Sequence, residues 1–431
     1  MRVLVQADLL RPCAPLNGGT GQKGTARSAR LGGHCLVSSA GAETRERLFT
    51  SDFLFAALAN FFSAFGQQTL TAILPVYVLT LGGSQADAGL VSGTLAFTAL
   101  LLRPLVGWLT DAWRRRPLVI IGTFSYALAS LTYMLAGTVP LVLLGRVIHG
   151  FGLCNYTTAG NAYIADTAPT YRRAEAMGIY TSAASVGLIV GPAIGFYVVS
   201  QLGFQRLFYF TGGLALTAFF VSFFARERRQ PSLSKRPPWS VRNGIVAVDA
   251  LPVAWIAVCL GMGFGPVSAF IAIFAQSRGI ENPGFYFTAQ AVALLISRPL
   301  AGRLADARGR AFVIVPGTML TSLALVLLPW ATDYPLFILS AAMFGLGFGT
   351  VQPAAMALLV DRVRPEQRGL AISTYFTGFD SGISVGSIGL GALSQAWGFG
   401  AMWPTSAACV LLGLLGLLAA RRFPTATTRA V

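Results

Sequence analysis

The sequence predicts an all-α membrane protein whose twelve transmembrane helices form two six-helix bundles, related by a pseudo-two-fold axis along the membrane normal. Three observations predict this fold: an apolar composition, twelve apolar stretches of membrane-spanning length, and an internal repeat. Of the 431 residues, 54% are hydrophobic and 11% are charged, against roughly 25% charged residues in ordinary soluble domains. The mean hydropathy is +0.64. A chain this apolar needs lipid as its main solvent.

Twelve apolar stretches follow one another from Asp52 onward, and each is long enough to cross a hydrocarbon core of about 30 Å as a helix. Turn signals or clustered charges separate them, as at Gly82–Gly83, Arg114–Pro117 and Glu281–Gly284. The predicted helices span residues 51–78, 86–109, 117–137, 140–165, 175–200, 205–225, 248–275, 284–304, 311–331, 334–360, 369–395 and 399–420.

Lysine and arginine lie almost entirely on one side of the predicted bundles. The two terminal segments and alternate loops hold 27 of the 32 Lys and Arg residues, whereas the other loops hold only Arg206 and Arg278. By the positive-inside rule both termini lie in the cytoplasm, and we expect a multi-pass protein of the plasma membrane, the cytoplasmic membrane of a bacterium. This topology accounts for the net charge of +16, so nucleic acid is not an expected partner.

The order of these segments predicts five parts. Residues 1–47 are rich in Gly, Ala and Arg and lack hydrophobic periodicity, which predicts a basic disordered extension; a targeting role or a misassigned start codon would give the same composition. Six-helix bundles at 48–225 and 248–420 flank a basic, Pro-rich cytoplasmic linker at 226–247. Residues 421–431 form a cytoplasmic tail.

The residues that carry most enzyme and metal chemistry are sparse in this chain. Its five cysteines (Cys13, Cys35, Cys154, Cys259 and Cys409) form no CxxC pair, and its only histidines are His34 and His149. No HExxH, GxSxG or GxxxxGK[ST] pattern occurs. We therefore expect neither an enzyme nor a bound metal or cofactor, and ATP is not the direct energy source within this chain.

An internal repeat at a constant offset of 195 residues relates the two halves. Residues 103–112 (RPLVGWLTDA) match residues 298–307 (RPLAGRLADA) at seven of ten positions. The same offset pairs Gly122 with Gly317, Gly150 with Gly345, Asp166 with Asp361, Arg173 with Arg368, Tyr180 with Tyr375, Gly187 with Gly382 and Gly191 with Gly386. Six helices per repeat give both halves the same orientation, with a central path between them, as in transporters that expose one site to each side in turn.

The loop after the second predicted helix, Gly107–Arg116 (GWLTDAWRRR), and its copy Gly302–Arg310 (GRLADARGR) resemble the G-x-L-a-D-r-x-G-r-k signature of the major facilitator superfamily. A glycine allows close helix approach, and an aspartate at a helix end can pair with arginines. The resemblance therefore implies a latch that holds one conformation, formed by Gly107, Asp111, Arg115, Gly302, Asp306 and Arg310. Both copies have alanine where the family usually has a basic residue, and Arg114 replaces the glycine of the first loop.

The fourth predicted helix contains LVLLGRVIHGFG (141–152), which is similar to a second motif of this superfamily. A guanidinium inside a membrane helix is costly unless it is paired or hydrated, so Arg146 should serve a function. The resemblance implicates this arginine in proton coupling. His149, on the same helix face, is either a titrating partner or a hydrogen-bonded packing residue.

The fifth predicted helix contains GLIVGPAIGF (187–196), which resembles the g-x-x-x-G-P-x-x-G-G motif of antiporters that export drugs. Glycines at four-residue spacing allow tight packing, and Pro192 removes one helix hydrogen bond. We interpret Gly187, Gly191, Pro192 and Gly195 as a packing motif that favours export over uptake. Tight packing without directional meaning is the alternative.

Asp380 is predicted to lie near the bilayer centre, because it follows the start of the eleventh helix by about three turns, or roughly 16 Å. A carboxylate at this depth stays protonated or pairs with a cation, and both arrangements suit proton-coupled transport. A structural partner for serine or arginine is the alternative. Arg103 and Arg298 lie nearer the cytoplasmic surface and are expected to snorkel in structural roles.

The other polar residues inside predicted helices are expected to face a water-filled path, since buried amides need partners. They are Asn60, Gln67, Gln68, Asn155, Tyr156, Gln290 and Gln352, with Tyr375 and Phe376 as aromatic lining for an apolar or amphipathic substrate.

Taken together, the sequence predicts a secondary active transporter that exports a small organic molecule by proton antiport with alternating access. Asp380, Arg146 and His149 are the predicted coupling and binding residues. A dedicated exporter or symporter of one metabolite, such as a sugar, an amino-acid derivative or a metal chelator, is the main alternative, and a non-transporting receptor is a weaker one. The expected partners are the substrate, protons and the lipid bilayer, and the resemblance implies a monomer.

Overall fold

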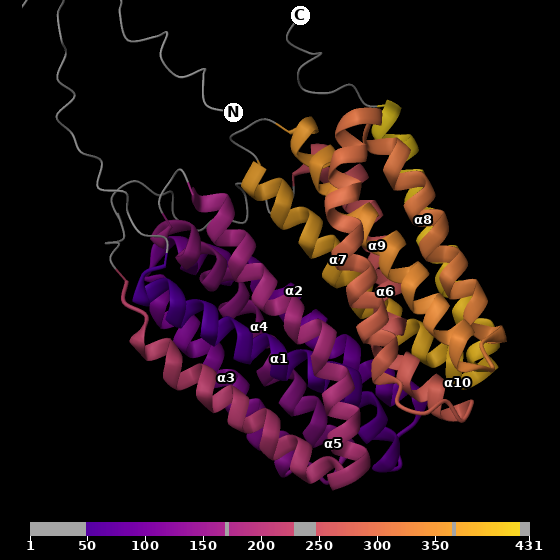
Figure 1. Ribbon diagram of the computed structural model, residues 1–431, viewed down its shortest axis with the longest axis horizontal. Coiled ribbons are helices and arrows are strands. Elements are labelled where there is room, and N and C mark those ends of the chain that lie inside the picture. Colours follow the sequence, from indigo (N-terminus) through magenta and orange to yellow (C-terminus); the bar gives the residue numbers. More distant parts are fainter. Residues whose placement is uncertain (1–48, 169–171, 228–246, 364–367, 423–431) are drawn as a thin grey trace, which may run out of the picture. The chain divides into compact units, whose positions relative to one another are not determined.

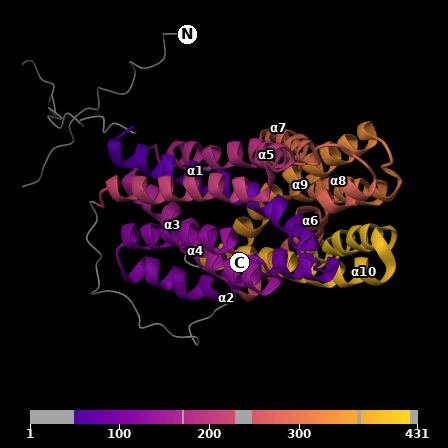
Figure 2. The same cartoon turned by 90° about the horizontal axis from the view of Figure 1, so that it is seen from below.

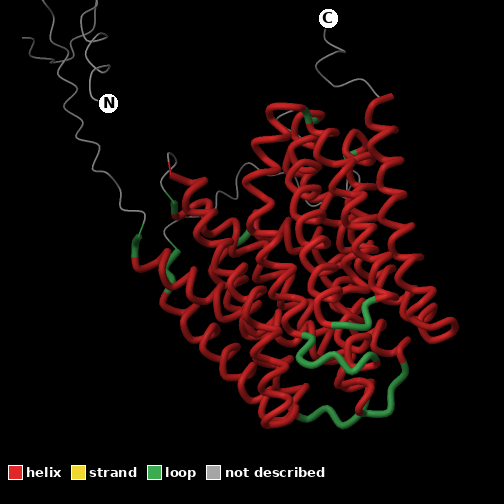
Figure 3. The backbone as a smooth tube through the Cα atoms, turned by 45° about the vertical axis from the view of Figure 1, so that its right-hand side comes forward, coloured by secondary structure: helices red, strands yellow, loops and turns green. Residues whose placement is uncertain are grey.

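The computed structural model describes residues 49–168, 172–227, 247–363 and 368–422. The predicted extension at 1–47, nearly all of the predicted linker and most of the predicted tail lie outside these residues. Within the described residues the chain is helical and contains no strand, as Figure 3 shows. The all-α prediction is therefore confirmed.

Ten α-helices make up the described part of the chain (Figure 1). Their bounds are α1 Ser51–Thr80, α2 Gln85–Ala112, α3 Arg115–Met134, α4 Val139–Thr167, α5 Arg173–Phe224, α6 Leu251–Ser277, α7 Gly284–Arg308, α8 Arg310–Leu327, α9 Tyr334–Arg362 and α10 Arg368–Arg422. Short 3₁₀ turns at Val248–Ala250 and Leu328–Trp330 precede α6 and follow α8.

Two of these helices each contain a chain reversal at a glycine. Gly203 in α5 has φ 81° and ψ 171°, and Gly398 in α10 has φ 75° and ψ 176°, a region that costs a side chain steric energy. Residues on both sides of Gly203 contact Phe65, namely Gly187 and Phe210. The two glycines are 195 residues apart, so the repeat places the same reversal in both halves and the ten helices contain twelve helical segments.

Eight helices are both long and apolar enough to cross a membrane, and two of them are the double segments α5 and α10. Helices α1 and α7 are outside this set, although they have 30 and 25 residues. Amide side chains lower the hydropathy of α1, and arginine and aspartate side chains lower that of α7. These two helices carry polar groups that the bilayer alone would not accept.

The repeat in the sequence is also a repeat in the packing. A Cβ on Gly122 would lie 2.7 Å from Tyr156 Cβ, and a Cβ on Gly317 would lie 2.7 Å from Val351 Cγ2, the equivalent position. Likewise Gly152 approaches the Gly122 carbonyl oxygen, and Gly347 approaches that of Gly317. In the first half α1 packs on α5 and α3 on α4; in the second, α6 packs on α10 and α8 on α9 (Figure 2).

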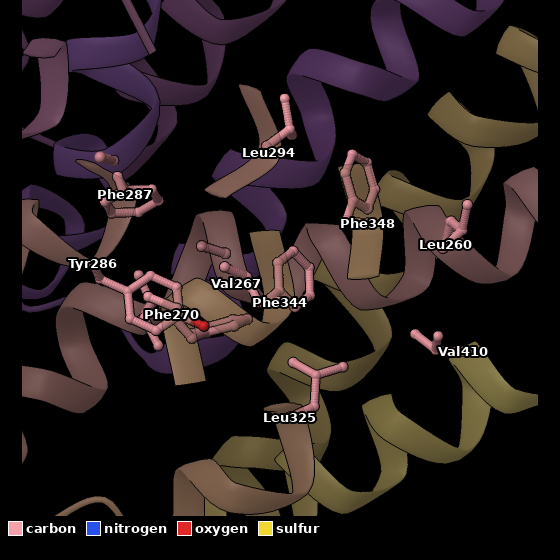
Figure 4. Close-up of a cluster of buried hydrophobic side chains, with 14 of the residues drawn as sticks. Leu260, Val267, Phe270, Tyr286, Phe287, Leu294, Leu325, Phe344, Phe348 and Val410 are labelled. Carbon is pink, nitrogen blue, oxygen red and sulfur yellow. The ribbon is translucent and has the colours of Figure 1, made fainter. Parts of the chain in front are cut away.

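The two halves differ in what fills their interiors. In the second half, rings and aliphatic side chains from five helices converge in a buried cluster (Figure 4), with Phe270 and Leu260 on α6 and Tyr286, Phe344 and Val410 on neighbouring helices. Phe270 and Phe344 are 0% exposed. An apolar cluster of this kind is close-packed.

The close helix approaches predict which glycines tolerate a side chain. A Cβ on Gly345 of α9 would overlap the Gln290 carbonyl oxygen of α7, whereas a Cβ on Gly389 of α10 meets nothing within 4 Å. We expect Gly345→Ala to lower the free energy of unfolding by about 1–3 kcal/mol because backbones must separate. Thermal unfolding of the detergent-purified protein measures this, with Gly389→Ala as the matched control. Equal melting temperatures for the two variants would contradict the packing described.

Candidate functional site

The halves meet where α2 packs on α10 and α7 packs on α5, and these two contacts are equivalent in the repeat. Near the end that carries the α1–α2 and α6–α7 connections, a Cβ on Gly93 would lie 3.0 Å from the Ser384 carbonyl oxygen. At the equivalent position Thr288 Oγ1 donates to the Ile189 carbonyl oxygen at 2.6 Å. Both pairs preserve the offset of 195. Close packing therefore joins the halves at this end, which we name the α1–α2 end.

Further along the same interface, an ion pair links the halves. Arg103 Nη2 of α2 lies 2.5 Å from Asp380 Oδ2 of α10. The two side chains are 21% and 13% exposed, and the fully buried Cys154 of α4 lies beside them. A charge pair this poorly hydrated is held by its own attraction, since removal of either partner would leave an uncompensated charge.

This pair differs from the sequence expectation for Arg103, which was a structural residue near the cytoplasmic surface. The guanidinium reaches across to the other half instead of snorkelling, because Asp380 supplies a counter-charge there. Asp380 itself lies inside α10 and pairs with an arginine, which both its coupling interpretation and its structural alternative allow, so its role in coupling stays a prediction.

Arg298, the repeat equivalent of Arg103, has a different environment. Its Nη2 donates to Gln352 Oε1 of α9 at 3.3 Å, within its own half. Its side chain is exposed, and it makes no ion pair among the residues that the structure describes. The repeat thus conserves the arginine and not its partner.

Arg146 lies in the interior of the first half, on α4. It is 0% exposed, and among the described residues its guanidinium forms no well-aligned hydrogen bond; the Tyr133 side chain is the polar group that interacts with it. Tyr133 and His149 are its electrostatic neighbours. His149 Nδ1 lies 3.3 Å from the Tyr133 hydroxyl, and its ring packs edge-on against Tyr126 with centroids 4.5 Å apart. The site therefore holds a positive charge among aromatic rings and one unbonded imidazole nitrogen, Nε2.

A small cavity borders this cluster. It has a volume of about 10 Å³, room for about one water molecule, and lies between α1, α3, α4 and the second segment of α5. Its polar lining includes Gln67, Ser63 and His149, and the Tyr126 hydroxyl donates to Gln67 Oε1 at 3.0 Å. The Ser63 hydroxyl and His149 Nε2 are buried without partners. This cavity lies inside the first half rather than between the halves.

Three predicted path residues bond within the first half. Asn60 Nδ2 donates to the Tyr180 carbonyl oxygen at 2.6 Å, and the Tyr156 hydroxyl donates to Asn60. These bonds tie α1 to α4 and α5. Asn155 donates to Phe151 of its own helix, and is 2% exposed. In this conformation Asn60 and Tyr156 link neighbouring helices, whereas the hydrogen bond of Asn155 stays within α4.

The other predicted path residues lie in varied settings. Gln290 Oε1 and the Tyr375 hydroxyl are buried without partners among the described residues. Gln68, Phe376 and Gln352 are half-buried, and Gln352 accepts the hydrogen bond from Arg298. Their contact with a substrate stays a prediction.

The two predicted latch loops form equivalent ion pairs at the opposite end of the molecule. Arg115 pairs with Asp166 at the end of α4, and Arg310 pairs with Asp361 at the end of α9 at 3.1 Å. Arg310 also pairs with Asp306. The side chain of Asp111 lies outside the described residues. These pairs join helices of one half, and the aspartates at positions 166 and 361 are partners that sequence reasoning noted only as a repeat match.

Gly107 and Gly302 do not show the close helix approach expected of them. A Cβ on either glycine would meet nothing within 4 Å. The close contacts between the halves described above lie at the α1–α2 end, so these latch glycines have no opposing helix against them in this conformation. Gly309 has φ 92°, whereas Arg114 at the equivalent position has φ −71°. The two loops therefore turn differently, as the missing glycine in the first copy requires.

The glycines of the fifth predicted helix lie against α1. A Cβ on Gly187 would be 2.9 Å from Phe65 Cα, and Gly195 approaches the Ile73 side chain. Thr69 Oγ1 donates to the Gly191 carbonyl oxygen at 3.1 Å. Pro192 lies inside α5. The motif thus brings α5 and α1 into backbone contact.

With this geometry in view, comparison with known proteins identifies the family. A model of the Major Facilitator Superfamily matches residues 56–286 and 253–430. The chain belongs to the major facilitator superfamily. As a member of this superfamily it is a multi-pass membrane transporter for small molecules and not an enzyme, which confirms those two predictions.

Individual relatives cover nearly the same length. An uncharacterised MFS-type transporter of Methanocaldococcus jannaschii is 24% identical over 375 residues, which are 85% of this chain and 97% of the relative. The multidrug resistance protein MdtG of Citrobacter koseri is 25% identical over 363 residues, which are 79% and 88% of the two chains. The crystal structure of the nucleoside transporter NupG matches with a TM-score of 0.69 at 15% identity, over 87% of this chain and 100% of that one. The structural likeness shows the superfamily fold.

The ion pair between the halves predicts a strong energetic coupling. Arg103→Leu or Asp380→Leu alone should each lower the free energy of unfolding by about 3 kcal/mol, because one charge stays poorly hydrated. The double variant should recover most of this loss. Denaturant titration of the purified protein in detergent gives the double-mutant cycle, and Arg206→Leu, at an exposed position, is the single-variant control. Additive losses in the double variant would contradict direct coupling.

Proposed function

We propose that this transporter exports a small organic molecule from the cytoplasm by proton antiport, with the end opposite the α1–α2 end facing the cytoplasm. The observation that carries the proposal is the Arg103–Asp380 ion pair, because it joins the two halves and its strength depends on one proton. A coupled transporter needs such a group, whose charge state changes the relative stability of two conformations.

The proton acts at the carboxylate of Asp380. While the carboxylate is ionised, Arg103 Nη2 donates to Oδ2 and the halves are held together at this level. Protonation neutralises Asp380, so the attraction to the guanidinium is lost, and it amounts to several kcal/mol in a poorly hydrated site. Antiport requires that Asp380 takes up this proton from outside the cell, in the conformation that is open at the α1–α2 end. Release of the proton to the cytoplasm restores the pair and returns the transporter to the present conformation.

The contacts at the α1–α2 end support assignment of this conformation as closed on that side. Gly93 faces Ser384, and Thr288 bonds Ile189, at equivalent places across the interface. Lysine and arginine are concentrated at the other end of the helices, which supports placing that end in the cytoplasm. In this assignment the present conformation accepts substrate from the cytoplasm.

Arg146 is proposed as a second coupling group, acting inside the first half. Its guanidinium is buried without an acidic partner or a well-aligned hydrogen bond among the described residues, which raises the free energy of this conformation. A second conformation in which the Arg146 guanidinium gains a partner would avoid this free-energy cost. His149 and the adjacent cavity supply the nearest polar surroundings for that rearrangement.

Two observations support export rather than uptake. The glycine motif of α5 packs against α1 and resembles that of drug-exporting antiporters. A relative of similar length is named a multidrug resistance protein. A dedicated exporter of one metabolite would share both features, so the range of substrates is decided by the following experiment.

Everted membrane vesicles containing the protein test export and coupling together. We expect several compounds from a panel of lipophilic cations, zwitterions and organic anions to dissipate a preformed pH gradient, because each molecule that enters drives a proton out. Asp380→Asn should lose this response, since the amide cannot exchange a proton. Gradient-sensitive dye fluorescence is the measurement.

Asp333→Asn, an exposed position in the α8–α9 connection, is the matched control and should behave as wild type. A response to a single compound would indicate a dedicated exporter. Gradient dissipation that persists in Asp380→Asn would remove that residue from the coupling mechanism, and no response to any compound would count against proton-driven export.

Alternating access requires the contacts at the α1–α2 end to separate in every cycle. In a cysteine-free background, Thr288→Cys with Ile189→Cys places two thiols across this contact. We expect oxidation to abolish transport by more than tenfold and reduction to restore it. Ser340→Cys with Ala324→Cys, across a comparable contact within the second half, is the control. Full transport by the cross-linked Thr288/Ile189 variant would contradict opening at this end.

A further inference from the structure

The interior charges of the helices are unbalanced. Three arginines, Arg103, Arg146 and Arg298, lie well inside membrane-spanning segments, and Asp380 is the one acidic residue at comparable depth in the described part of the chain. Asp380 is neutralised by Arg103. Two guanidinium groups therefore lack a counter-charge, and an uncompensated cation within the bilayer is costly.

The repeat shows where one missing counter-charge would lie. The pseudo-two-fold operation carries the Gly93–Ser384 contact onto the Thr288–Ile189 contact. Ten residues after Gly93 is Arg103, and four residues before Ser384 is Asp380. The same steps from Thr288 and Ile189 lead to Arg298 and Ser185. The first arginine pairs with a carboxylate, whereas the position equivalent to that carboxylate in the other copy is a serine.

The surroundings of Arg298 leave it accessible. Its side chain is exposed, and one guanidinium nitrogen is held by Gln352 at 3.3 Å. Ser185 is half-buried, and its hydroxyl donates to the carbonyl oxygen of Thr181 in its own helix. A serine side chain is shorter than that of aspartate and carries no charge, so the position equivalent to Asp380 supplies no counter-charge for Arg298.

We propose that Arg298 binds an anionic group of the transported substrate, a carboxylate or another oxyanion, at the place that the Asp380 carboxylate takes in the symmetric pair. This inference rests on the proposed export function and names its substrate class. The planar guanidinium offers two parallel N–H donors to an oxyanion, and Gln352 fixes its orientation. Ser185 adds a hydroxyl donor. The substrate thereby neutralises Arg298 just as Asp380 neutralises Arg103.

The proposal also explains how substrate and proton can compete without sharing a residue. Substrate binding at Arg298 bridges α7 to α5, whereas the ion pair bridges α2 to α10. Both bridges join the two halves at equivalent positions. An anion at Arg298 and a proton at Asp380 therefore have opposite effects on how firmly the halves are joined, which is the relation that antiport requires.

Two dyes of nearly identical size test whether the carboxylate charge of a ligand controls its binding. Rhodamine 110 carries a free carboxylate and rhodamine 123 is its methyl ester. Fluorescence anisotropy with the full-length protein in detergent free of phospholipid measures binding directly, so the result does not depend on transport, and lipid phosphate is removed as a competing anion. We expect rhodamine 110 to bind at least tenfold more tightly than its ester.

Variants then test whether the carboxylate of rhodamine 110 binds at Arg298. Arg298→Gln should remove the preference for rhodamine 110, and Arg298→Lys should keep part of it, because the charge remains without the two parallel donors. Ser185→Asp should weaken binding of rhodamine 110 about tenfold by supplying the missing carboxylate internally, whereas Ser185→Asn should not. Arg206→Gln, an exposed arginine near Gly203, is the matched control and should bind as wild type.

Equal binding of the two dyes, tighter binding of the ester, binding of neither, or an unchanged preference in Arg298→Gln would overturn the proposal. The vesicle assay separates this from failure of the proposed function. If rhodamine 123 but not rhodamine 110 dissipates the gradient, the result supports proton-driven export and contradicts the proposal of an anionic substrate.

Discussion

The Arg103–Asp380 ion pair is the interaction on which the arrangement of this transporter depends. It lies between the two halves, in surroundings where neither charge is well hydrated, and it is the charged contact described between α2 and α10. In water such a pair would contribute little, because screening and side-chain entropy offset the attraction. Within a membrane protein the alternative is an unpaired charge, so the pair holds the halves as long as both groups are ionised. One proton can therefore change how firmly the halves are joined.

The two halves share a fold and differ in chemistry. Repeat-equivalent glycines make equivalent contacts. In both halves an arginine of the loop motif also pairs with an aspartate at the end of the neighbouring helix. The interior of the first half holds Arg146 and His149, whereas the repeat equivalents in the second half are Ala341 and Phe344, both 0% exposed. The packing of the helices thus occurs in both halves, whereas the ionisable groups Arg146, His149 and Asp380 each occur in only one half. The repeated fold allows two related conformations, and the unequally placed charges make the relative stability of those conformations depend on protonation. Alternating access requires such a pair of conformations.

The helices and the repeat were predictable because the bilayer restricts the possible structures. A backbone in lipid must satisfy its own hydrogen bonds, so an apolar stretch of about 20 residues becomes a helix of nearly the predicted bounds. The fourth predicted helix, 140–165, is Val139–Thr167 in the structure, and the tenth, 334–360, is Tyr334–Arg362. The candidate site was less predictable. The hydrogen bonds of Asn60 and Tyr156 join groups far apart along the chain, and helical periodicity does not say whether an amide faces a path or a neighbouring helix.

The sequence by itself determined the fold class, the approximate helix bounds, the two-fold repeat and the presence of charges at membrane depth, because each follows from composition, length and a constant offset along the chain. The tertiary structure decided which charges meet. Arg103 and Asp380 are 277 positions apart, and Arg103 looked like a snorkelling residue from its depth alone. Only the packing of α2 against α10 brings its guanidinium to a carboxylate. The equivalent Arg298 donates to Gln352 of its own half, and the position equivalent to Asp380 is Ser185. Depth can be counted along a helix, whereas the partner of a side chain depends on helix rotation and on neighbours that the three-dimensional fold supplies.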